Sequence, residues 1–156
     1  MRSRLVRAAR TWPGVRGWGE TLLALAVFAA LALPLGRWGG LLEASAALPP
    51  GAALRVVLRA FFVPSALEEI LFRVLPPPRW ALPALGAYVL THPLNALFVR
   101  GARDVFLNPL FLLLTLLLGA LCSLLYRRTG SLWPPVVLHW AVVSVWLPWG
   151  GAAALG

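Results

Sequence analysis

The sequence predicts an all-α, polytopic integral membrane protein, a helical bundle of about five transmembrane helices with room for a sixth. Of its 156 residues, 60% are hydrophobic and only 12% are charged, whereas about 25% are charged in an ordinary soluble domain. The mean hydropathy is +0.82. Apolar runs separated by Gly, Pro and Arg fill the chain, so we expect a single membrane domain over residues 1–156 without a separate soluble domain.

Residues 1–17 are predicted to form a basic N-terminal arm ahead of the first apolar run. The arm carries five arginines: Arg2, Arg4, Arg7, Arg10 and Arg16. The run that follows predicts a first transmembrane helix at about 20–36. It also resembles a signal peptide cleaved after residues 44–46. The transmembrane interpretation is favoured because cleavage would remove the basic anchor of the remaining spans.

Four more spans are expected, at 52–75, 80–99, 109–126 and 131–149. Gly and Pro residues mark a loop before the second span, and three consecutive prolines from Pro76 stop that span. Tryptophans at both ends of the fifth span are typical of the membrane interface. With the N-terminus in the cytosol, eight arginines fall inside and five outside, setting Arg73 apart, which favours this orientation.

The net charge of +9 comes from arginines at the ends of the apolar segments. In that position they are expected to contact the headgroups of the lipid bilayer, so no nucleic acid partner is predicted. The chain has no Lys or Gln but many Arg, Ala, Gly and Pro residues, which is typical of a GC-rich bacterial genome. We therefore expect the protein in a bacterial cytoplasmic membrane.

Few strongly polar side chains lie inside the predicted spans. They are Glu68, Glu69 and Arg73 in the second span, His92 and Asn95 in the third, and His139 in the fifth. A charged residue at the centre of a membrane helix costs about 2.5 to 3.5 kcal/mol, so such residues usually pair or function. Counted from the cytosolic helix ends, Glu68 and His139 lie at a depth of roughly 12 Å and His92 at roughly 18 Å, which predicts a common level in the membrane.

Helical spacing suggests different roles for the two adjacent glutamates. Glu69 and Arg73 are four residues apart and can pair on one helix face, whereas Glu68 points about 100° away. We expect Glu68 to turn toward His92 and His139. Substitution of Glu69 by Gln should therefore mainly reduce stability, and the same change at Glu68 should mainly reduce rate.

Pro64 interrupts the second span just before the glutamates. A proline leaves a carbonyl unpaired about one turn earlier, and Ser65 followed three residues later by Glu68 matches a capping box. The pattern predicts that the helix restarts here. Such a break within the membrane is tolerated only where it lines protein or water.

These residue types suit hydrolysis of an amide bond. A carboxylate and an imidazole in a cavity of low dielectric constant can deprotonate water, and a second imidazole can stabilise the oxyanion. The alternative is a Zn²⁺ site with Glu68, His92 and His139 as ligands, although the H-E-x-x-H spacing is absent. A non-enzymatic immunity or partner-binding protein, and a proton-coupled transporter, are further alternatives. The lack of inverted repeats disfavours the transporter.

Two sequence motifs resemble the CPBP family (CAAX proteases and bacteriocin-processing enzymes, also called Abi), which are glutamic-type intramembrane proteases. Residues 68–73 match its E-E-x-x-x-R motif, and residues 88–92 match the motif of an aromatic residue before a His, with Tyr88 where Phe is commoner. The stretch 126–135 leading to His139 is also similar to the bacterial branch. The resemblance covers about residues 55–149, the expected catalytic core.

The resemblance implies an intramembrane endopeptidase that acts on a membrane-anchored protein or peptide and needs no cofactor. It implies that Glu68 and His92 activate water, that Glu69 and Arg73 support the motif helix, and that His139 helps to stabilise the oxyanion. The family often has Asn or Asp four residues after this His, where this chain has Val143, so Asn95 is a candidate replacement. Eukaryotic members cleave prenylated CAAX tails, but the resemblance does not fix the substrate of this chain.

Overall fold

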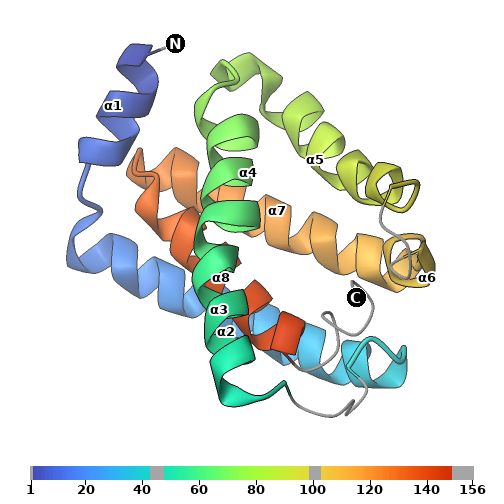
Figure 1. Ribbon diagram of the computed structural model, residues 1–156. Helices are drawn as coiled ribbons and strands as arrows, with labels where there is room; N and C mark the ends of the chain where they lie inside the picture. The colour runs from blue at the N-terminus through green and yellow to red at the C-terminus, as the bar shows by residue number, and fades with distance from the viewer. Residues whose placement is uncertain (1, 43–47, 99–102, 149–156) are drawn as a thin grey trace.

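The computed structural model describes residues 2–42, 48–98 and 103–148, and over these residues the protein is entirely helical (Figure 1). The elements in chain order are α1 (Arg2–Arg10), α2 (Gly14–Trp38), α3 (Pro50–Ala60), η1 (Phe61–Ala66), α4 (Leu67–Glu69), η2 (Ile70–Val74), η3 (Pro78–Trp80), α5 (Ala81–Asn95), α6 (Arg103–Phe106), α7 (Pro109–Thr129) and α8 (Trp133–Trp146). The all-α prediction is confirmed.

Three helices of the described residues are long and apolar enough to cross a membrane: Gly14–Trp38, Pro50–Val74 and Pro109–Thr129. They correspond to the first, second and fourth predicted spans, and they are the pattern of an integral membrane protein. The third and fifth predicted spans are the shorter helices α5 and α8, with 15 and 14 residues. At 1.5 Å per residue each is about 22 Å long, less than the roughly 30 Å hydrocarbon core. The predicted ends at 99 and 149 lie outside the described residues.

The chain from Pro50 to Val74 forms one kinked helix, composed of α3, η1, α4 and η2, and it carries both glutamates. The kink lies at Val63, whose backbone is extended (φ −133°, ψ 118°), directly before Pro64. This confirms the predicted interruption. The expected capping box is wrong, because the buried Ser65 hydroxyl has no hydrogen-bond partner among the described residues. Instead, the Leu67 N–H bonds to the carbonyl of Phe62 across the kink, so the helix resumes without a side-chain cap.

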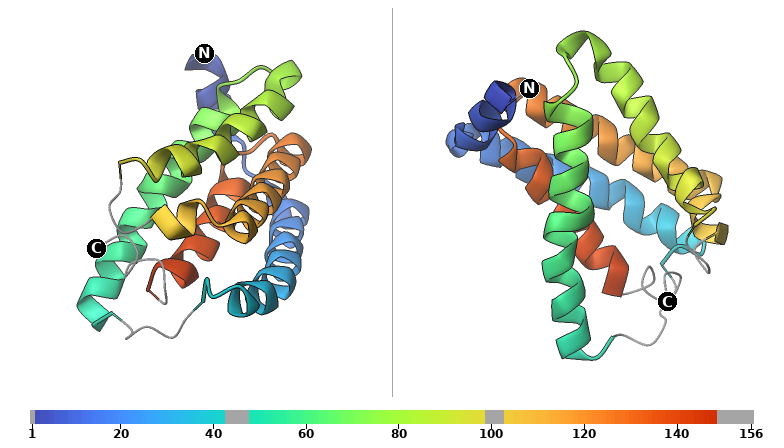
Figure 2. Two further views of the ribbon diagram at one scale, coloured as in Figure 1. Left: turned by 90° about the vertical axis from the view of Figure 1, so that its right-hand side faces the viewer. Right: turned by 45° about the horizontal axis from the view of Figure 1, so that its top comes forward.

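Helix α8 occupies the middle of the bundle, with the kinked helix on one side and α2 and α7 on the other (Figure 2). It begins with Pro134 and Pro135 in its first turn, where the missing N–H groups need no partner. Gly130, at φ 63°, ends α7 in the left-handed conformation and lets the chain reverse into α8. His139 therefore lies on the most enclosed helix of the described fold.

The first part of the predicted basic arm is a helix, α1, that docks onto the bundle. Ala8 is only 1% exposed and packs with Val74 and Val136. The carbonyl of Ala8 accepts a hydrogen bond from Leu132 N at 3.0 Å, and the carbonyl of Ala9 accepts one from the Trp133 indole Nε1 at 2.9 Å. These contacts connect α1 to the end of the kinked helix and to the start of α8.

Gly119 allows α5 and α7 to approach closely beneath the site. A Cβ atom at this position would lie 2.7 Å from Leu85 Cδ1 and 2.8 Å from Tyr88 Cε1. Substitution of Gly119 by Ala is therefore expected to reduce the free energy of unfolding by about 1–3 kcal/mol through overpacking. Unfolding in detergent would measure this loss. Gly86→Ala is the matched control because no other part of the described structure comes within 4 Å of its new Cβ. Equal losses in both variants would contradict the packing argument.

Candidate active site

A cavity of about 590 Å³ lies between α2, the kinked helix, α5, α7 and α8. Most of the side chains that line it are apolar. The site residues predicted from sequence that also line it are Glu68, His92, Asn95 and His139. The structure thus places ionisable groups from three helices around one space, as their similar depths along the helices indicated.

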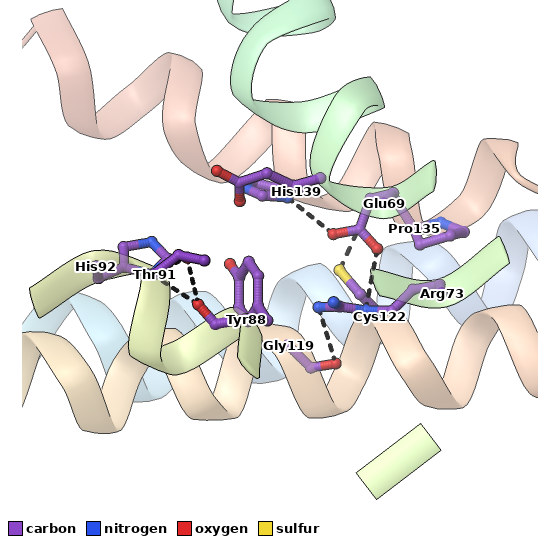
Figure 3. A network of polar contacts seen from close by, with 10 residues as sticks. Glu69, Arg73, Tyr88, Thr91, His92, Gly119, Cys122, Pro135 and His139 are labelled. Carbon is purple, nitrogen blue, oxygen red and sulfur yellow. Dashed lines mark hydrogen bonds and ion pairs between the residues drawn. The ribbon is translucent and has the colours of Figure 1, made fainter. Parts of the chain in front are cut away.

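Behind the cavity wall, the buried carboxylate of Glu69 contacts two side chains (Figure 3). Its Oε2 lies 3.3 Å from Arg73 Nε, so the ion pair expected from the four-residue spacing is confirmed. The two atoms are not aligned for a hydrogen bond, and the guanidinium instead donates through Nη2 to the carbonyl of Gly119 at 3.4 Å. The second oxygen, Oε1, lies 2.9 Å from Nδ1 of His139.

His139 lies between the two glutamates. Because the carboxylate of Glu69 acts as acceptor, we assign the shared proton to Nδ1 of His139. The other ring nitrogen, Nε2, lies 3.9 Å from Glu68 Oε2, on the side of the cavity. The contact between Glu69 and His139 was not predicted, because helical spacing relates residues of one helix and says nothing about a residue 70 positions away.

His92 lines the cavity in an aromatic setting. Its Nδ1 is 3.1 Å from the carbonyl of Tyr88, and its ring stacks at a tilt or edge-on against Tyr88, Phe106 and Phe111. With Nδ1 directed to its own helix, Nε2 is the nitrogen available for chemistry. In the part of the chain that the structure describes, no hydrogen bond or ion pair joins His92 to Glu68. Glu68 thus contacts His139, and it shares only the cavity with His92.

Asn95 and Val143 both line the cavity, but they differ in polarity and in exposure. Asn95 is the last residue of α5 and is exposed. Val143 is buried on α8, one turn beyond His139, and offers the cavity no polar atom. The position at which the resemblance led us to expect Asn or Asp therefore does face the cavity, but it contributes no hydrogen-bond donor.

Metal binding was the alternative use of these residues. Among the described residues, no group of three His, Cys, Asp or Glu side chains is arranged to hold a metal ion. Glu68 and His139 form a pair, and His92 stands apart from it. The arrangement of these three side chains is thus a poor fit to a zinc centre with three protein ligands.

Long apolar helices that enclose carboxylates and imidazoles beside a cavity define a class, the membrane proteins with a polar site inside the helical bundle. Within this class, residues 49–145, more than half of the chain, match the family described as type II CAAX prenyl endopeptidase Rce1-like. The chain belongs to this family of membrane proteases, and the resemblance to CPBP proteins is confirmed. Comparisons with curated proteins and with solved structures gave no significant match.

Proposed function

We propose that this protein is an intramembrane endopeptidase that hydrolyses a peptide bond of a membrane-anchored protein or peptide, with water activated by Glu68 and His92. The observation that carries the proposal is the shared cavity, into which Glu68 and both imidazoles project from three different helices. The apolar lining of the cavity suits a substrate segment that leaves the lipid, and family membership supplies the protease chemistry.

In the proposed reaction, Glu68 accepts a proton from a water molecule in the cavity, and His92 orients this water from the opposite wall. The water oxygen attacks the carbonyl carbon of the scissile peptide bond, and the resulting intermediate collapses as the C–N bond breaks and Glu68 returns its proton to the leaving amine nitrogen. His139, held at Nδ1 by Glu69, can carry a second proton at Nε2 and donate a hydrogen bond to the oxyanion. Glu69 and Arg73 do not line the cavity, so we assign them the support of His139 and of the motif helix. Asn95, at the end of α5, is the candidate for a further contact to substrate.

We also propose that residues 1–156 form one membrane domain of five spans, in a bacterial cytoplasmic membrane with the N-terminus in the cytosol. The exposed arginines of α1 and those at the end of α7 support this orientation, because they lie at the same end of the bundle. The active site then lies in the cytosolic half of the membrane.

The protein in lipid vesicles is expected to release product from a membrane-anchored peptide, and a chelator should leave the rate unchanged. His92→Ala should lower the rate by at least about 100-fold, the usual contribution of a positioned acid or base. Leu94→Ala, on the exposed side of the same helix, is the matched control. Loss of cleavage with a chelator and its recovery with added Zn²⁺ would contradict the metal-free mechanism.

A further inference from the structure

Tyr88 lies at the centre of the site but has no role in the chemistry described so far. Its side chain is 1% exposed, and its ring is held between charged and aromatic groups. The guanidinium carbon of Arg73 lies 4.4 Å from the ring centroid. The rings of His92 and His139 lie edge-on at 5.2 and 6.1 Å between centroids. The orientation of the Tyr88 ring is therefore fixed by the residues that form the site.

The hydroxyl group of Tyr88 is available to a molecule in the cavity. The hydrogen bonds that Tyr88 makes use its backbone carbonyl, which faces Thr91 Oγ1 at 2.6 Å and His92 Nδ1 at 3.1 Å. The hydroxyl takes no part in them, and Figure 3 shows the hydroxyl end of the ring on the side toward His139. Tyr88 also lines the cavity. A buried tyrosine usually gives its O–H to a partner, and among the described residues this hydroxyl has none.

The proposed reaction forms an oxyanion that could accept a further hydrogen bond, and the Tyr88 hydroxyl can donate one. The oxyanion that forms beside His139 has one donor from that imidazole, and the wall one turn further along α8 is the apolar Val143. Asn95 is exposed at the end of α5, two turns of helix beyond Tyr88. Tyr88 is thus a buried hydroxyl donor in the cavity lining, with its ring next to that of His139.

We propose that the Tyr88 hydroxyl donates a hydrogen bond to the oxyanion, together with His139, during hydrolysis. As water oxygen bonds to the carbonyl carbon, one water proton passes to Glu68 and the electron pair of the carbonyl moves onto oxygen. That oxygen then accepts a hydrogen bond from the O–H group of Tyr88, and the tyrosine keeps its proton throughout. The inference rests on the proposed function and adds a catalytic residue to it.

Tyr88→Phe removes this hydroxyl and keeps the ring against Arg73 and His92. We expect kcat to fall about 100-fold, as is typical for loss of one oxyanion donor, with KM and the unfolding temperature in detergent unchanged. Tyr126→Phe is the matched control, because Tyr126 is the other tyrosine of the chain and does not line the cavity. Binding of a non-cleavable peptide should be equal in all three proteins.

The outcomes separate this inference from the function on which it rests. If Tyr88→Phe cleaves at the original rate while Glu68→Gln is inactive, the hydroxyl is not an oxyanion donor and only the inference is overturned. A loss of rate that is matched by a loss of thermal stability or of peptide binding would show a structural role and would also overturn it. If Glu68→Gln cleaves normally, the proposed mechanism itself fails.

Discussion

Substitution of Glu68 by Gln is expected to abolish cleavage of a membrane-anchored peptide, with a fall of about 1000-fold or more in kcat/KM. Gln has nearly the shape of Glu but cannot accept a proton from water. Glu68 faces the cavity, its Oε2 has no hydrogen-bond partner among the described residues, and the imidazole of His139 lies 3.9 Å from that oxygen. Because little of the fold depends on this carboxylate, the unfolding temperature should stay the same.

Glu20→Gln is the control for this experiment. Glu20 pairs with Arg16 and Arg128 far from the cavity, so its loss should leave the rate unchanged. Product release should be followed in vesicles, and unfolding should be measured in detergent on the same preparations. An active Glu68→Gln protein would show that another group activates water, and an unfolded one would show that Glu68 is a structural residue.

Replacement of Arg73 by Met should cause the largest loss of stability, about 3–5 kcal/mol, because it leaves the carboxylate of Glu69 buried without its cation. Glu69 is 0% exposed, and its other partner, His139, is a neutral ring unless it gains a second proton. Adding Glu69→Gln to this variant removes the buried charge, so the double variant is expected to recover much of the stability. Unfolding by denaturant in detergent would measure the free energy of unfolding of the original protein, of Arg73→Met and of the double variant.

Arg79→Met is the control for charge alone, since Arg79 is exposed in η3, shortly after the end of the kinked helix. Loss of this arginine should have little effect on stability. If Arg73→Met unfolds at the same denaturant concentration as the original protein, the ion pair does not stabilise the helix. If the double variant is no more stable than Arg73→Met, the loss comes from the contacts of Arg73 with Gly119 and Tyr88 instead.

What the sequence predicts well is what a single helix determines. The pair between Glu69 and Arg73 follows from a spacing of four residues, and the kink follows from the covalent ring of Pro64. The depth of each ionisable residue along its own helix also predicted that Glu68 and His139 would line one cavity. These features need no knowledge of how the helices pack against each other.

Contacts between helices could not be predicted from the sequence. The bond between Glu69 and His139 depends on how α8 is packed, and no periodicity contains that information. The docking of α1 was missed because Ala8 is a small residue in a stretch whose arginines suggested only a basic arm. The capping box at Ser65 failed because the backbone formed its own bond across the kink, a competition that a four-residue pattern cannot show.

The docking of α1 limits how far this protease can be trimmed. The family match begins at residue 49, so it leaves out α1 and α2, although α2 forms one wall of the cavity through Phe28 and its neighbours. Cutting the protein back to residues 49–145 would remove that wall together with the acceptors for Leu132 N and the Trp133 indole. Residues 49–145 are therefore not expected to form the intact site when expressed alone. The region that matches the family is shorter than the folded unit that holds the site together.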